Sequence, residues 1–162
     1  MEECELNADP IEPEYPTLEQ FTTPVDDQYV ALVGQATYAF AYLEWQVVSL
    51  GQRIAPGFIY DAATMTAGTM ARELKAKVAS FAGDASLQSA LSDLALKFSG
   101  LVKRRNDLVH AHPATFRGEQ RLHYWSPRNI FTWEPEDIVV FVHEIEALAR
   151  EGNKLYYDPR MQ

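Results

Sequence analysis

The sequence lacks several features that define common protein classes. Its 162 residues include one cysteine, Cys4, which excludes an internal disulfide and a metal site built from several cysteines. No apolar run approaches the roughly 20 residues that a membrane-spanning helix needs. The first residues are acidic, whereas a secretory signal peptide begins with basic ones. From these absences we expect a cytoplasmic protein that does not cross a membrane.

Motifs for cofactors and for serine hydrolases are missing as well. The chain has neither a glycine-rich phosphate-binding loop nor a G-x-S-x-G motif around a nucleophilic serine. Its histidines do not have the spacing of metal ligands on one helix. They are His110, His112, His123 and His143. We therefore expect no cofactor and no metal site.

Charge is distributed unevenly along the chain. The formal net charge of -9 disfavours broad, non-specific binding of nucleic acid, because such binding rests on many phosphate contacts. The first 27 residues carry acids and no Lys or Arg, but basic residues outnumber acidic ones between Lys97 and Arg128. A local basic patch is therefore predicted in spite of the acidic total.

The composition divides the chain into an arm and one domain. Residues 1–25 combine many acids with several prolines and few aliphatic residues, which predicts an extended N-terminal arm. Residues 26–158 are long enough, and apolar enough, to enclose a single hydrophobic core. Within this domain, residues 113–134 form an insert with a different pattern of apolar residues.

Apolar residues at alternating spacings of three and four predict four long helices. The expected ranges are 26–54, 61–81, 85–111 and 134–157. In the insert, the aromatic segments 121–125 and 129–133 predict a short β-hairpin or an ordered loop. The predicted fold class is therefore all-α: an up-and-down four-helix bundle with an aromatic hairpin or loop between helices three and four and an extended acidic arm.

The first predicted helix carries an aromatic strip beside its apolar seam. Tyr38, Tyr42 and Trp45 form this strip. Because aromatic residues dominate the energetics of cores and interfaces, we favour core or subunit contact over a ligand site. Glu44 lies in the same segment and is a candidate counter-charge for Arg105.

Residues 103–113, K-R-R-N-D-L-V-H-A-H-P, stand out at the end of the third predicted helix. Arg105 falls on the apolar stripe of this helix. A guanidinium there is costly unless it is paired or the stripe faces a cleft or a partner. Asn106 and His110 are four residues apart and share a helix face, with Arg105 one position round. We expect these three side chains to meet at one polar spot near the helix end.

The segment 105–110, R-N-D-L-V-H, resembles the signature of the HEPN superfamily: an Arg, usually followed by a polar residue, and then a His near the end of a bundle helix. The resemblance implies a helical bundle, usually dimeric, in which the motifs of two chains line a cleft that cuts RNA without metal. Many relatives are toxins or defence proteins, and others only bind. It implies that Arg105 and His110 are catalytic and that Asn106 positions them. One branch carries a modified Tyr two residues after the His, where this chain has His112, which argues against that branch.

The residue types fit the same chemistry. Histidine can take and give a proton near neutral pH, and arginine can hold a phosphate and stabilise its extra charge in the transition state. Both suit RNA cleavage by the ribose 2′-OH, which DNA lacks. A single Arg and a single His provide few catalytic groups for this reaction. A two-fold dimer would bring together two copies of each. The expected substrate-binding residues are Lys103, Arg104, His112, Arg117 and Arg121.

The sequence thus predicts a metal-independent, HEPN-like endoribonuclease that leaves a 2′,3′-cyclic phosphate and acts as a toxin or defence effector. Its expected partners are a second copy of the chain, RNA, and an antitoxin or regulatory protein. Two alternatives stay open. One is a non-catalytic HEPN-like module that binds a nucleotide, RNA or protein. The other is a purely structural role, in which Arg105 pairs with Glu44 and His110 is a cation at a helix C-terminus.

Overall fold

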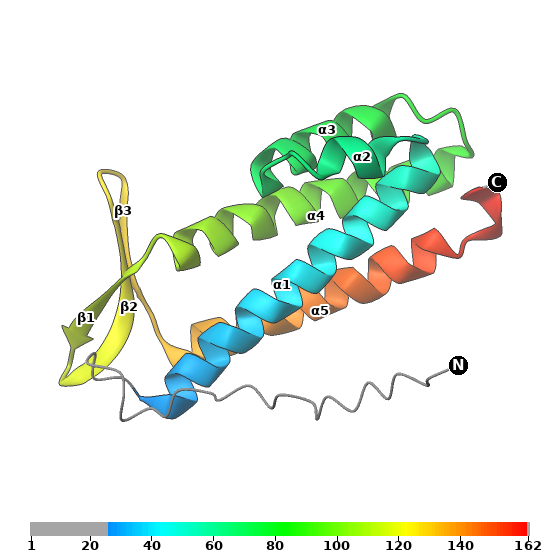
Figure 1. The fold of residues 1–162 in the computed structure, drawn as a ribbon. Coiled ribbons are helices and arrows are strands. Elements are labelled where there is room, and N and C mark those ends of the chain that lie inside the picture. Colours follow the sequence, from blue (N-terminus) through cyan, green and yellow to red (C-terminus); the bar gives the residue numbers. More distant parts are fainter. Residues whose placement is uncertain (1–25, 162) are drawn as a thin grey trace, which may run out of the picture.

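The structure is a computed structural model that describes residues 26–161. The predicted acidic arm, residues 1–25, lies outside the described residues. The elements in chain order are α1 (Asp27–Ile54), α2 (Phe58–Ala62), α3 (Ala67–Ala79), α4 (Ala85–Val109), β1 (His112–Phe116), β2 (Glu119–Ser126), β3 (Asn129–Trp133), α5 (Pro135–Tyr156) and the 3-10 turn η2 (Pro159–Met161) (Figure 1). None of the described helices is long and apolar enough to cross a membrane.

The predicted all-α, up-and-down four-helix bundle is wrong. Residues 26–161 form five α-helices and one antiparallel three-stranded sheet with the strand order β1-β2-β3. The errors lie in two places, the second predicted helix and the insert. The first and last predicted helices, 26–54 and 134–157, agree with α1 and α5 to within a residue at each end.

The second predicted helix, residues 61–81, is in fact two helices. The short α2 ends at Ala62, and α3 begins only after Thr66, whose hydroxyl accepts a hydrogen bond from the N–H of Thr69 at 3.2 Å. Thr66 has an extended backbone (φ -72°, ψ 158°), as an N-cap residue does. The apolar spacing predicted one continuous helix through this segment. The cap at Thr66 instead starts a new helix.

The insert is a sheet of three strands instead of a two-stranded hairpin or loop. β2 and β3 pair as the sequence predicted, with Trp125 opposite Ile130. The added strand is β1, which takes residues 112–116 and pairs with β2. Arg117 and Gly118 connect the two strands with φ angles of 53° and 88°, as a two-residue type I′ turn requires. Consequently α4 ends at Val109, and not at the predicted Ala111.

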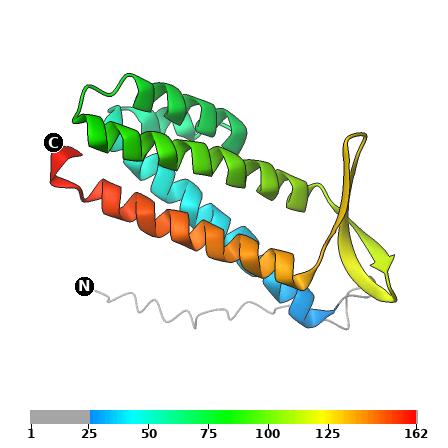
Figure 2. The ribbon, with the colours of Figure 1, turned by 180° about the vertical axis from the view of Figure 1, so that it is seen from behind.

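The core lies among the long helices, and the sheet covers one end of it. Figure 1 and Figure 2, seen from opposite sides, show α1, α4 and α5 side by side, with α2 and α3 over the half that is distant from the sheet. Phe40 of α1 and Phe98 of α4 stack with ring centroids 6.2 Å apart. Because α2 and α3 stop short of the sheet, they leave the last turns of α4 uncovered.

Two kinds of contact fix the sheet to the bundle. An aromatic series, with ring centroids 5.3–5.7 Å apart, runs from Tyr124 and Phe131 through buried Trp133 to Phe141 of α5. The second contact is a hydroxyl bridge. Tyr29 of α1, which is 4% exposed, accepts a hydrogen bond from the N–H of Leu122 at 2.9 Å and donates one to the carbonyl of Trp133 at 2.8 Å. Burial raises the pKa of the Tyr29 hydroxyl, so it keeps the proton that it donates.

Replacement of Tyr29 by phenylalanine is expected to lower the free energy of unfolding by about 1–3 kcal/mol, because the N–H of Leu122 and the carbonyl of Trp133 lose a buried partner. Urea denaturation followed by circular dichroism measures this change. Tyr38→Phe is the matched control, since Tyr38 is 80% exposed, and it should leave stability unchanged. Equal stability of the two variants would contradict the bridging role.

Candidate functional site

The segment with the Arg-Asn-His motif lies where the bundle meets the sheet. α4 runs directly into β1 there, as Figure 1 shows. The motif therefore has α1 on one side, α5 on another and the sheet beyond its end. Its residues lie at the end of α4 that α2 and α3 leave uncovered.

Arg105 points from α4 towards α1. Its Nη2 lies 3.3 Å from Oε1 of Glu44, and its guanidinium lies 5.1 Å from the ring centroid of Phe40. The two charged side chains are 26% and 27% exposed. Glu44 thus supplies the counter-charge and Phe40 an aromatic surface, while about a quarter of the Arg105 side chain remains open to solvent.

His110 ends α4 as its C-cap residue, and its imidazole is exposed. Its backbone N–H donates to the carbonyl of Asn106 at 3.0 Å. Within residues 26–161, the side chains of Asn106 and His110 have no hydrogen-bond partner. At 3.6 residues a turn, Asn106 and His110 are about 40° apart around α4, whereas Arg105 and His110 are about 140° apart. The expected single polar spot is therefore wrong for one chain, because Arg105 is on another side of the helix.

Arg104 points to the opposite flank of α4, towards α5. It forms an ion pair with Glu144, and its guanidinium lies 4.9 Å from the ring centroid of Phe141 and 5.6 Å from that of Trp133. It also approaches the carbonyl of Asp137 at 3.5 Å. These contacts join α4 to α5 and to the end of β3. The charge of Arg104 is thus used in an ion pair that stabilises the packing of these elements.

Arg121 is likewise occupied by structural contacts. Its side chain is 11% exposed and forms ion pairs with Glu119 and, at 3.5 Å, with Glu134. Its guanidinium lies 4.8 Å from the ring of Tyr29. The structure thus buries most of this predicted substrate-binding side chain beside the Tyr29 bridge.

The other predicted substrate-binding residues are accessible. Lys103 is exposed on α4, and His112 is exposed at the start of β1. Arg117 is exposed in the β1–β2 turn, with its guanidinium 5.0 Å from the ring of Phe116. Of these three accessible residues, His112 lies nearest to His110 along the chain, two residues after it.

The structure adds one residue that sequence analysis did not select. His123 is the Cα partner of His112 across β1 and β2, and of Thr132 across β2 and β3. Its Nδ1 lies 3.0 Å from the hydroxyl oxygen of Thr132, which fixes the ring. The strand register brings His112 and His123 together. Their spacing of 11 residues in the sequence gives no sign of this proximity.

Two grooves of the described surface lie between neighbouring helices. One of about 450 Å³ between α4 and α5 is lined by Leu101, Arg104 and Glu144, among others. Another of about 320 Å³ between α1 and α5 is lined by residues that include Tyr38 and Tyr42. Neither groove is lined by Arg105 or His110. Nor do the described residues contain three His, Cys, Asp or Glu side chains grouped to hold a metal ion.

Comparison of this chain with protein-family models, with curated proteins and with solved structures gives no match. A functional conclusion therefore rests on the residues at the end of α4 and on their surroundings. These residues offer an accessible imidazole, a neighbouring amide and a partly exposed guanidinium. Such groups can move a proton and bind a phosphate.

The Arg105–Glu44 pair is expected to stabilise the fold by about 0.5–1 kcal/mol, since it is half-buried and stacked on Phe40. A double-mutant cycle with Glu44→Gln and Arg105→Gln measures this coupling. The pair Arg150–Glu146, at 3.8 Å with side chains 67% and 46% exposed, is the control and should couple more weakly. A coupling energy no larger than that of the control would show that the contact does not hold α1 to α4.

Proposed function

We propose that this chain is a HEPN-like, metal-independent endoribonuclease that works as a homodimer. The observation that carries the proposal is the exposed imidazole of His110 at the end of α4, which has no partner among residues 26–161 and follows the partly exposed Arg105 by five residues. We propose a cytoplasmic hydrolase that acts as a toxin or defence effector. An antitoxin or another regulatory protein would then restrain it.

In the proposed reaction, the imidazole of His110 takes the proton of the ribose 2′-OH. The 2′-oxygen forms a bond to the adjacent phosphorus, the bond from phosphorus to the 5′-oxygen breaks, and a second imidazole protonates the leaving oxygen. The products are a 2′,3′-cyclic phosphate and a 5′-hydroxyl. Arg105 balances the charge that builds up on the phosphate oxygens, and Asn106 orients the groups.

A second copy of the chain supports this reaction for a geometric reason. Arg105 and His110 lie on different sides of α4, so the Arg105 of one protomer can act with the His110 of the other. Dimers also need an apolar contact surface. The strip Tyr38, Tyr42 and Trp45 on α1 provides one, with 80%, 53% and 57% exposure, in place of the core contact that was one of its expected roles.

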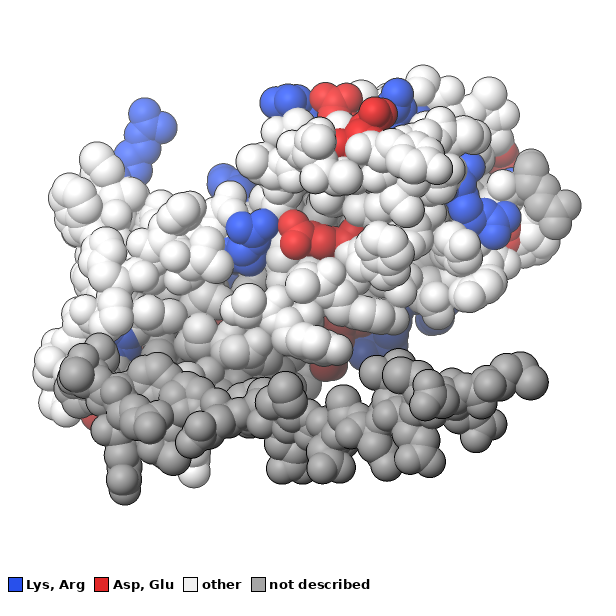
Figure 3. Space-filling model, in the orientation of Figure 1, with Lys and Arg blue, Asp and Glu red and all other residues white. Residues whose placement is uncertain are grey.

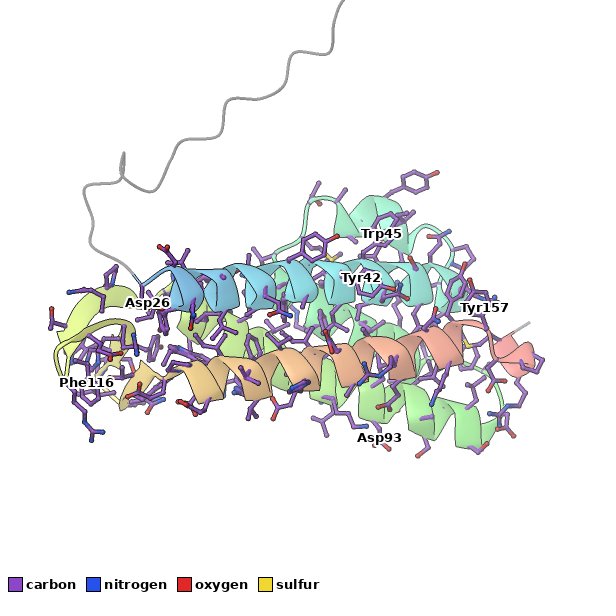
Figure 4. All side chains as sticks on the ribbon, turned by 90° about the horizontal axis from the view of Figure 1, so that it is seen from below. Asp26, Tyr42, Trp45, Asp93, Phe116 and Tyr157 are labelled. Atoms are coloured by element: carbon purple, nitrogen blue, oxygen red, sulfur yellow. The ribbon has the colours of Figure 1, made fainter. Side chains whose placement is uncertain are left out.

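The figures show the setting of this strip. Figure 4 shows Tyr42 and Trp45 along α1, away from the sheet end that Phe116 marks. In Figure 3, uncharged surface lies over α1 around a basic and an acidic group near the middle of the view. Large exposed aromatic side chains within such a surface are typical of protein contacts. We assign this surface to the homodimer.

The second candidate function is a non-catalytic HEPN-like module that binds a nucleotide, RNA or a protein. The contacts of Arg105 with Glu44 and Phe40 favour it, because an arginine held in this way can serve the fold without touching a substrate. The two proposals differ in what they require of His110. Only the nuclease needs its imidazole.

Purified protein incubated with mixed single-stranded RNA in EDTA is expected to cleave it and leave 2′,3′-cyclic phosphate ends. His110→Ala should slow cleavage roughly 100-fold or more, because the imidazole carries the proton transfer. His143→Ala is the matched control, since His143 is an exposed histidine of α5 outside the motif, and it should cleave at the wild-type rate.

Light scattering of the same samples is expected to give the mass of a dimer. Intact RNA in all samples, with folded and dimeric protein, would reject the nuclease and favour the binding module. Equal activity of wild type and His110→Ala would remove His110 from the site. A monomeric mass in a cleaving sample would reject the shared site.

A further inference from the structure

We infer that the outer face of the sheet binds single-stranded RNA and leads it to His110. We define this outer sheet face by His112, His123, Trp125, Ile130 and Thr132. The inference rests on the proposed function, since it names the surface that holds the substrate of the same site. It concerns the insert, a part of the chain that the HEPN resemblance does not explain.

The strand register separates the two faces of the sheet. Side chains of directly opposed residues point to the same side, and those of residues two apart on a strand do so too. Leu122, Phe131 and Trp133 therefore point inward, where the aromatic series reaches Phe141. His112, His123 and Thr132 form one row of the other face, and Trp125 with Ile130 forms the next row.

The outer sheet face has the groups that stack nucleobases. Trp125 and Ile130 are opposed across β2 and β3, and they are 59% and 60% exposed. Proteins that bind single-stranded nucleic acid stack its bases on exposed aromatic side chains, and each such contact contributes strongly to affinity. An exposed Trp–Ile pair is therefore a suitable platform for an unpaired base.

The charge of this face suits phosphates. Its five residues include two histidines and no carboxylate, and Arg128 in the β2–β3 turn is exposed. Within residues 26–161, no carboxylate lies within ion-pair distance of Arg128. Figure 3 shows a basic side chain at the tip of this hairpin and no acidic one next to it on that face. By the same register, Glu119 and Arg121 also lie on this side of the sheet, towards the β1–β2 turn, and Arg121 pairs there with both Glu119 and Glu134.

The outer sheet face is continuous with the motif. His112 follows His110 by two residues, a distance of at most about 7 Å along an extended chain. His112 and His123 face each other across β1 and β2, and the bond from His123 to Thr132 holds the second ring in place. A strand whose base stacks on Trp125 thus passes the two imidazoles on its way to the end of α4.

Binding is measured on the full chain carrying His110→Ala, in EDTA, by the fluorescence anisotropy of a labelled single-stranded RNA of mixed sequence. Trp125→Ala should weaken binding at least fivefold, as expected for the loss of one stacked base. Trp125→Phe should keep most of the affinity, because a phenyl ring also stacks. Tyr60→Ala is the matched control, since Tyr60 is an aromatic residue that is 81% exposed but lies on α2, outside both the sheet and the strip on α1, and it should bind as tightly as the parent.

Three results would overturn the inference: unchanged affinity of Trp125→Ala, an equal loss in Tyr60→Ala, or no RNA binding by any folded variant. If Trp125 is needed to bind another protein and the chain binds no RNA, the outer sheet face is a protein-binding surface instead. The test of the RNA-binding surface and the test of the nuclease can fail independently. If the wild type does not cleave RNA but binding depends on Trp125, the surface stands and the nuclease fails. If cleavage depends on His110 while Trp125→Ala changes neither affinity nor rate, the nuclease stands and the surface fails.

Discussion

The hydroxyl of Tyr29 joins the helical part of this protein to its sheet. It satisfies the N–H of Leu122 on β2 and the carbonyl of Trp133 on β3 at the same time, from a buried position on the first turn of α1. The guanidinium of Arg121 packs on its ring. Because β1 follows α4 directly, the place of the sheet also fixes what surrounds the end of α4. The proposed site thus depends on a contact made nearly a hundred residues away in the sequence.

Two adjacent arginines at the end of α4 contact different helices. Side chains of neighbouring residues are about 100° apart around a helix, so Arg104 reaches α5 and Arg105 reaches α1. Arg104 pairs with Glu144 among the rings of Phe141 and Trp133, and it holds three elements together. Among residues 26–161, Arg105 has a single carboxylate partner, at 3.3 Å, and part of its side chain lies in solvent. This difference makes Arg105 the one that can exchange its partner for a phosphate.

The sequence predicted those parts of the fold that depend on local signals. The apolar period placed the starts of α1 and α4, where the structure shows the side chains of Asp26 and Asp84 capping the helices. The period could not show that Thr66 divides the second helix. It also missed β1, since His112–Phe116 has no apolar alternation and Pro113 argues against a strand. The motif of the proposed site is visible in the sequence. The contacts of Arg104 and Arg121, and the pairing of His112 with His123, depend on residues that only the tertiary structure brings near.

The central claim is that RNA meets this protein where α4 enters the sheet. Hydrogen exchange of the full chain carrying His110→Ala, with and without single-stranded RNA, tests it most directly. We predict slower exchange at residues 105–112 and in β2 and β3, where the motif and the outer sheet face lie. Protection confined to the groove between α1 and α5, or no protection at a concentration where RNA is bound, would contradict the account.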